Sequence, residues 1–194
     1  DETPGIPTEV KDLVGMGKND QHGNLVRPIV TPGRGKYNAS SGGLIVGAHT
    51  RFHVGGSFLM FFGELSSMSG FDISIKNEAQ CLNAPNAGGP GNWYAMGQAY
   101  FGAKAKIGIE VNLLLISGRF TIFDAGAAAV IRAGLPNPTW VDGYIGGYFR
   151  ILDGAVKGKF NFHVNVGEPC KVPGDPPRSY KKSIPYLRSC SISK

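Results

Sequence analysis

The chain has 194 residues, of which 42% are hydrophobic and 18% are charged, values that suit a globular domain and argue against wholesale disorder. Its 29 glycines and 13 prolines exceed average usage without the three-residue period of collagen, so we expect many turns and few long helices. The net charge of +6 could suit nucleic acid, but the cations are scattered and no recognition motif accompanies them, so we expect no nucleic-acid partner.

Residues 1–43 are polar and punctuated by proline and glycine, which predicts an extended arm. Residues 25–30 could add a strand, but Pro28 within them restricts that strand to a sheet edge. Asp1 opens directly into this polar segment without an initiator Met or a signal peptide, so we expect a processed or excerpted chain. No window reaches the roughly 18 consecutive apolar residues of a membrane helix, so we expect no transmembrane helix.

From residue 44 the pattern becomes that of β-strands. Residues 44–54 alternate, residues 57–65 are almost wholly apolar, and Gly55-Gly56 between them predicts a hairpin turn. Residues 71–76 alternate again, and we expect their apolar members to face the core. These members are Phe71, Ile73 and Ile75.

The second half contains both the clearest strand signal and a helix candidate. In Val156–Val166 the even-numbered residues are Val, Gly or Phe and the odd-numbered residues are Lys, Asn or His, which predicts a strand with one buried and one solvent-exposed face. Asp153-Gly154 predicts the hairpin turn before it. Residues 124–133 are the helix candidate, because Asp124 can cap the first turn, alanine favours helix, and Gly134 can end it.

Together these patterns predict an all-β fold, an antiparallel glycine-rich sandwich or barrel with one short helix and extended N- and C-terminal arms. Residues 44–170 form its β domain. Residues 1–43 form the first arm, with room for edge strands, and residues 171–194 form an extended, proline-rich, basic tail.

Three cysteines, Cys81, Cys170 and Cys190, are too far apart in sequence for a CxxC-type zinc site. Cys81 lies in a loop-like stretch and Cys170 follows the last predicted strand, so a disulfide between them would close the core. Cys190 could pair with either of them, bond to another chain or stay a free thiol. Loop positions favour bridges over three reduced thiols, so we expect an extracellular or cell-surface location.

No motif with a catalytic mechanism occurs, and the carboxylates are scattered, so we expect neither an enzyme nor a cofactor. On one strand, His49 and His53 would lie about 13 Å apart, too far to share a metal ion, so we expect no metal site. Trp93, Tyr94 and Trp140 flank strands and loops, which makes them candidates for stacking on glycans or for an interface. Packing within the domain is the alternative.

Residues 92–100 (NWYAMGQAY), 127–140 (AAAVIRAGLPNPTW) and 148–170 (YFRILDGAVKGKFNFHVNVGEPC) resemble a region of very large secreted surface proteins of the Bacteroidetes, which carry TANFOR or fibronectin-like domains. The resemblance covers about residues 44–170. It implies export to the cell surface and assembly into a larger envelope or filament structure, and it offers no active site to carry over.

The leading hypothesis is a non-enzymatic structural subunit of an extracellular or cell-surface assembly, such as a filament, layer or envelope complex. Its partners would be copies of itself or other subunits, joined through sheet edges and terminal arms. One alternative is a carbohydrate-binding, adhesive β-sandwich with glycans as partners. Another is part of an outer-membrane β-barrel, since alternation of small and aromatic residues also suits lipid-facing strands.

Overall fold

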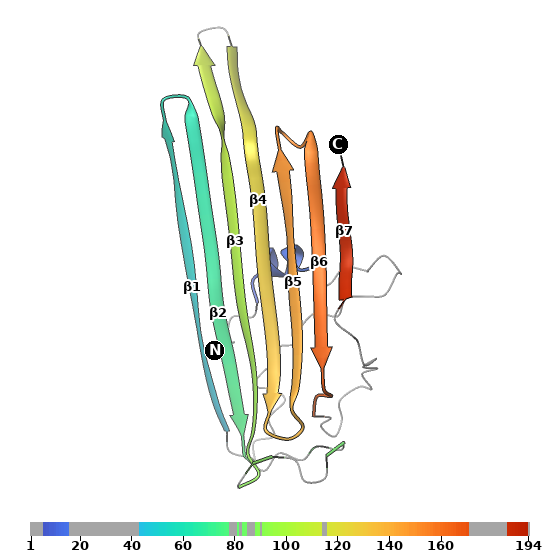
Figure 1. Cartoon of the computed structure of the whole chain (residues 1–194). Coiled ribbons are helices and arrows are strands. Elements are labelled where there is room, and N and C mark those ends of the chain that lie inside the picture. Colours follow the sequence, from blue (N-terminus) through green and yellow to red (C-terminus); the bar gives the residue numbers. More distant parts are fainter. Residues whose placement is uncertain are drawn as a thin grey trace.

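Seven antiparallel strands follow one another in chain order across one sheet, and a short helix lies on one face (Figure 1). This computed structural model describes residues 6–15, 43–77, 81, 83–84, 88–89, 91–113, 116–170 and 186–193. Within these residues the prediction of an all-β, antiparallel fold with one short helix is confirmed. The elements are α1 (Thr8–Leu13), β1 (Gly43–Phe58), β2 (Phe61–Lys76), β3 (Tyr94–Leu113), β4 (Ile116–Leu135), β5 (Trp140–Ile151), β6 (Val156–Val166) and β7 (Tyr186–Ser193).

Each strand pairs with its sequence neighbours, so the sheet is a meander. The sequence did not distinguish between a sandwich and a barrel. The described strands form a single sheet that is not closed, with β1 paired to β2 and β7 paired to β6. Because all six pairings are antiparallel, β1 and β7 run in the same direction. These two strands form the opposite edges of the sheet (Figure 1).

The predicted arm and tail are described only in part. Within residues 1–43 the structure describes chiefly α1 and its flanks, and the predicted edge strand at 25–30 lies outside the described residues. Within residues 171–194 it describes β7, which pairs with β6. Residues 6–15 therefore include a helix that lies on the sheet, and residues 186–193 form its seventh strand.

The predicted helix at residues 124–133 is wrong. These residues lie within β4, and the helix is α1 instead. Strand β4 pairs with β3 on one side and β5 on the other over this stretch. Long-range pairing therefore overrides the local helix propensity of the alanines.

One of the two predicted hairpin turns is in the expected place. Asp153-Gly154 lies between β5 and β6, and Gly154 has a φ of 92°, a conformation that suits glycine. The turn predicted at Gly55-Gly56 is wrong, because β1 continues through both residues, which pair with Glu64 and Gly63 of β2. The chain turns instead at Leu59-Met60, where Leu59 has a φ of 56°.

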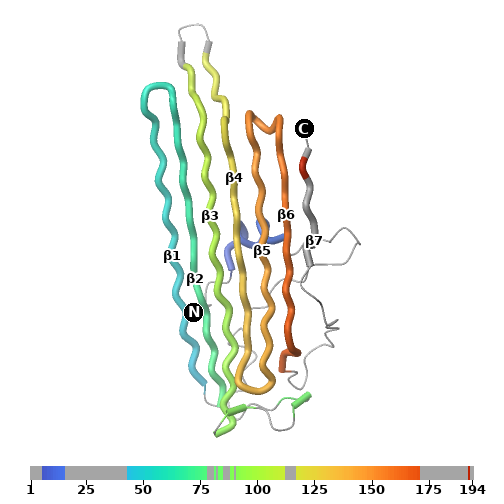
Figure 2. Tube along the Cα trace, in the orientation of Figure 1, coloured from blue at the N-terminus to red at the C-terminus, as the bar shows by residue number. Residues whose placement is uncertain are grey.

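Helix α1 lies on a row of small residues near the middle of the sheet, behind the strands in the view of Figures 1 and 2. Gly102, Ala128 and Gly146 are neighbours on β3, β4 and β5, because Ala128 pairs with both glycines. A Cβ at Gly146 would lie 2.7 Å from the Cα of Val14, so glycine permits this close approach. The surrounding core comprises Ile6, Val10, Val14, Met68, Tyr100, Ala128, Val130 and Tyr144.

The two faces of the sheet differ in chemistry. The face under α1, which we call the polar face, holds Asp72, Tyr100, Val130 and Tyr144, the residues that alternate with them along each strand and their direct partners on neighbouring strands. The alternation in β4 shifts by one residue at the bulge opposite Ile107 and Gly108, so Arg119 also lies on the polar face. The remaining strand residues form the apolar face. Phe71 and Ile73 lie on the apolar face and are 41% and 42% exposed, so the expectation that they face the core is wrong. Alternation shows which residues share a face, but the position of α1 decides which face is covered.

Candidate functional site

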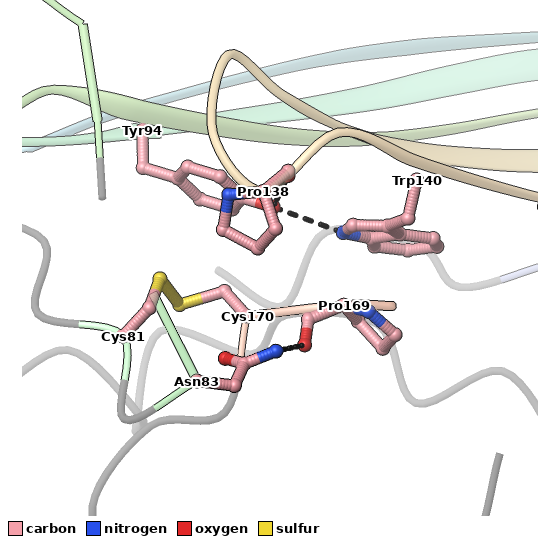
Figure 3. Close-up of a disulfide and its surroundings, with 7 residues drawn as sticks. All are labelled: Cys81, Asn83, Tyr94, Pro138, Trp140, Pro169 and Cys170. Carbon is pink, nitrogen blue, oxygen red and sulfur yellow. Dashed lines mark hydrogen bonds between the residues drawn. A yellow bond between two sulfur atoms is a disulfide. The ribbon is translucent and has the colours of Figure 1, made fainter. Parts of the chain in front are cut away.

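A disulfide joins Cys81 to Cys170 at one end of the sheet, with 5.1 Å between their Cα atoms (Figure 3). Beside it, the Asn83 side-chain amide donates a hydrogen bond to the Pro169 carbonyl at 3.1 Å. The bridge connects the segment before β3 to the segment after β6, across 89 residues of sequence. A disulfide of this kind indicates an oxidising compartment. The backbone of Cys190 pairs with Phe160 in β7, and its side chain lies outside the described residues.

Two of the three aromatic candidates, Tyr94 and Trp140, pack within the chain above this disulfide (Figure 3). Tyr94 and Trp140 are 3% and 6% exposed. The Tyr94 hydroxyl donates to the Pro138 carbonyl at 2.7 Å, and the Trp140 indole N–H donates to the Tyr94 hydroxyl at 3.0 Å. Trp93 is partly buried against Gly89, where an added Cβ would lie 2.7 Å from the indole nitrogen. These rings therefore close the end of the sheet, and the two buried ones present no open face for a sugar.

A buried charged cluster lies on the polar face where β4, β5 and β6 are neighbours. Asp142 accepts hydrogen bonds from Arg132 at 2.6 Å and from Tyr144 at 3.4 Å, and its other oxygen lies 2.6 Å from Nε2 of His163. The Tyr144 ring stacks on His163 with 4.3 Å between ring centroids. Each partner satisfies a lone pair of the buried carboxylate, so the cluster fixes three strands together.

Other polar pairs also cross between neighbouring strands on this face. Gln98 donates to Asp72 at 2.9 Å and Tyr148 donates to Asp124 at 2.8 Å. Nearer the opposite end of the sheet, Arg119 of β4 reaches across β3 and donates to Glu64 of β2 at 2.6 Å, and this pair is about half exposed. The charged side chains of the described strands β1 to β6 therefore lie on the face that α1 covers.

The apolar face lacks charged residues on strands β1 to β6 as described. Phe101, Ile131 and Ile145 lie in the central strands β3, β4 and β5, yet they are 53%, 51% and 47% exposed. Its polar side chains include Thr50 and Ser69, whose hydroxyls lie 2.9 Å apart in a hydrogen bond. The large exposed members are Leu44, Val46, Phe52, Val54, Phe58, Phe61, Leu65, Phe71, Ile73, Phe101, Ile107, Phe120, Phe123, Ile131, Leu135, Ile145, Ile151 and Val166.

The β1 edge is long and open among the described residues. The strand has 16 residues, no proline and an uninterrupted register with β2, and all of its residues except Ile45 are exposed. A two-residue turn follows β1, so Phe58 and Phe61 form the hydrogen-bonded pair that closes the hairpin. Hydrogen-bonded pairs alternate along an antiparallel ladder, so the even-numbered residues of β1 direct their backbone N–H and C=O groups toward β2. Odd-numbered residues, such as His49 and His53, therefore direct their backbone N–H and C=O groups away from β2.

Sequence reasoning missed the cluster around Asp142 and the open β1 edge. A signal for the cluster was present, because Arg132 and Asp142 flank the proline-containing loop 136–139 at similar distances, and a hairpin there pairs them directly. No comparable signal marks the edge, since strand order is a property of the whole sheet. His49 and His53 lie on β1, four residues apart.

Comparisons with known proteins give no relative for this chain: no family model, curated protein or solved structure matches it. The resemblance to Bacteroidetes surface proteins therefore stays a prediction. In the described part of the chain, no helix is long and apolar enough to cross a membrane. Over the same residues, no group of three or more His, Cys, Asp or Glu side chains is placed to hold a metal ion.

Proposed function

We propose that this chain is a non-enzymatic structural subunit of an extracellular or cell-surface assembly, joined to its neighbours through the edges of its sheet. The observation that carries the proposal is the β1 edge, which is exposed along a strand of 16 residues. An open edge of this length is a template for another strand, and natural monomers usually block it with proline, bulges or a covering element. None of these lies on β1 among the described residues.

The second edge supplies a partner for the first. Strand β7 pairs with β6 on one side, and it runs in the same direction as β1. When two copies are related by an axis along the strands, β7 of one copy and β1 of the next pair in parallel. Such a contact is heterologous, so it builds rings or filaments rather than closed pairs. The disulfide supports a location outside the reducing cytoplasm.

The experiment is size-exclusion chromatography with light scattering on the full chain, in buffer and in mild detergent, for the wild type, His53→Pro and His53→Ala. His53→Pro removes an N–H that points away from β2, whereas His53→Ala removes the side chain and keeps that N–H. We expect the wild type to form oligomers, His53→Pro to shift toward monomer, and His53→Ala to behave as the wild type.

Two results would overturn this proposal. A wild type that is monomeric at every concentration in both media has no assembly to explain. An oligomer that His53→Pro and a second edge variant, His49→Pro, leave intact does not use the β1 edge. Circular dichroism of each variant verifies that the sheet is retained.

A further inference from the structure

The apolar face is too large to be incidental surface. Strands β1 to β6 at a spacing of ~4.8 Å, with about 15 residues at ~3.3 Å each, give an area of roughly 1,400 Å². The largest apolar patch on a typical monomer is about 300–600 Å², and larger ones mark an interaction site. The size of this face therefore calls for a partner that covers it.

The lack of charged residues on the apolar face of β1 to β6 favours an uncharged partner. The register places Lys104 and Lys106 of β3 on the polar face, while Ala103, Ala105 and Ile107 between and beside them lie on the apolar face. Thr50 and Ser69 share one hydrogen bond, which pairs the O–H donor of one hydroxyl with the oxygen of the other and lowers the cost of removing the pair from water. Hydrocarbon is the medium that such a surface matches.

The dimensions of the face also fit hydrocarbon. Its apolar residues run from Val141 to Ile151 on β5 and from Phe61 to Ile75 on β2, 11 and 15 residues. With strands tilted by ~35–45°, these runs span about 23–38 Å perpendicular to a membrane. The apolar band of a membrane-spanning sheet is ~25 Å tall and the hydrocarbon core is about 30 Å thick.

We infer that the apolar face contacts the acyl chains of a lipid bilayer, with α1 and the polar face directed away from lipid. This inference rests on the proposed function, because lipid excludes open sheet edges, and β1 and β7 must then be paired with strands of other subunits. A second copy stacked on the same face is the competing occupant. Protein interfaces end in a polar rim, whereas Ile151 and Val156 continue the apolar face to the β5–β6 turn.

The test places tryptophan on each face and asks whether lipid reaches it. Phe101→Trp and Ile145→Trp lie on the apolar face, and Lys104→Trp is the matched control on the polar face of β3. Each full-length variant is reconstituted in phosphatidylcholine vesicles with either ordinary or brominated acyl chains. Quenching by bromine falls off steeply with distance, so rings in contact with the acyl chains are quenched most, and the parent chain, with Trp93 and Trp140, supplies the baseline.

We expect brominated chains to remove most of the fluorescence added by Phe101→Trp and Ile145→Trp, and little of that added by Lys104→Trp. Unquenched emission at both apolar positions in a chain that remains oligomeric overturns the lipid contact and leaves the proposed assembly standing, with a second copy as the occupant. A chain that fails to float with the vesicles also overturns it. Quenching in a chain that is monomeric in the vesicles, shown by cross-linking, would instead contradict the proposed assembly.

Discussion

The Arg132 guanidinium donates a hydrogen bond to the Asp142 carboxylate at 2.6 Å, with side chains 14% and 3% exposed. The two residues are direct partners in the pairing of β4 and β5. His163 of β6 contacts the other carboxylate oxygen, so one buried carboxylate connects three consecutive strands. A charge this well buried is tolerated because its partners supply what water would otherwise provide.

Replacing Asp142 with Asn should therefore destabilise the fold strongly. The change leaves Arg132 buried without its counter-charge, and breaking a buried pair in this way costs about 3–5 kcal/mol. The measurement is the free energy of unfolding in denaturant, with Glu64→Gln as the control. Glu64 pairs with Arg119 at the same 2.6 Å, but both are 41–47% exposed. The control should lose less than ~1 kcal/mol, and equal losses in the two variants would contradict this account.

The close contact between α1 and the sheet at Gly146 gives a second prediction. Gly146→Ala should displace the helix, because the new Cβ would meet the Leu13 carbonyl and lie 2.7 Å from the Cα of Val14. Overpacking of this kind costs about 1–3 kcal/mol. Hydrogen–deuterium exchange of residues 8–14 is the measurement, and we expect faster exchange there than in the wild type.

Gly143→Ala is the matched control for that change. Gly143 lies on the same strand, but on the apolar face, and the nearest atom to an added Cβ is the Val130 carbonyl oxygen at 3.9 Å. It should leave the exchange of α1 unchanged. If both alanines accelerate exchange equally, the effect comes from β5 itself rather than from contact with the helix.

Much of this fold could be predicted from alternation, and the remainder depends on contacts that a single sequence does not display. Val156–Val166 was predicted with the bounds that β6 has. The helix prediction at residues 124–133 failed because pairing with β3 and β5 outweighs alanine propensity. The predicted orientation of Phe71 and Ile73 was wrong for another reason. We expected the apolar face of the sheet to be buried, whereas α1 covers the polar face.

The disulfide should contribute a large part of the stability. Closing a loop with a sequence separation of 89 residues is expected to be worth roughly 4–5 kcal/mol in the chain-entropy description. Cys170→Ser should lower the free energy of unfolding, measured in denaturant, by about that amount. Cys190→Ser is the same chemical change outside the bridge and should lower it much less. Mass spectrometry of the alkylated, unreduced wild type should show two hydrogens fewer than expected for the same chain without the disulfide. Three alkylated thiols in that experiment would contradict the bridge.

A single lysine on the apolar face should report on its environment. Ala127 is an exposed residue of β4, with Ala103 and Gly147 opposite it on β3 and β5. In water, Ala127→Lys would be a surface change within about 0.5 kcal/mol, but near the middle of a bilayer it costs roughly 2–4 kcal/mol. We therefore expect the variant to keep wild-type stability in aqueous buffer and to lose vesicle association in flotation. Ala127→Leu, which adds bulk without charge, should float as the wild type does. Equal flotation of the lysine and leucine variants would mean that this face does not meet hydrocarbon.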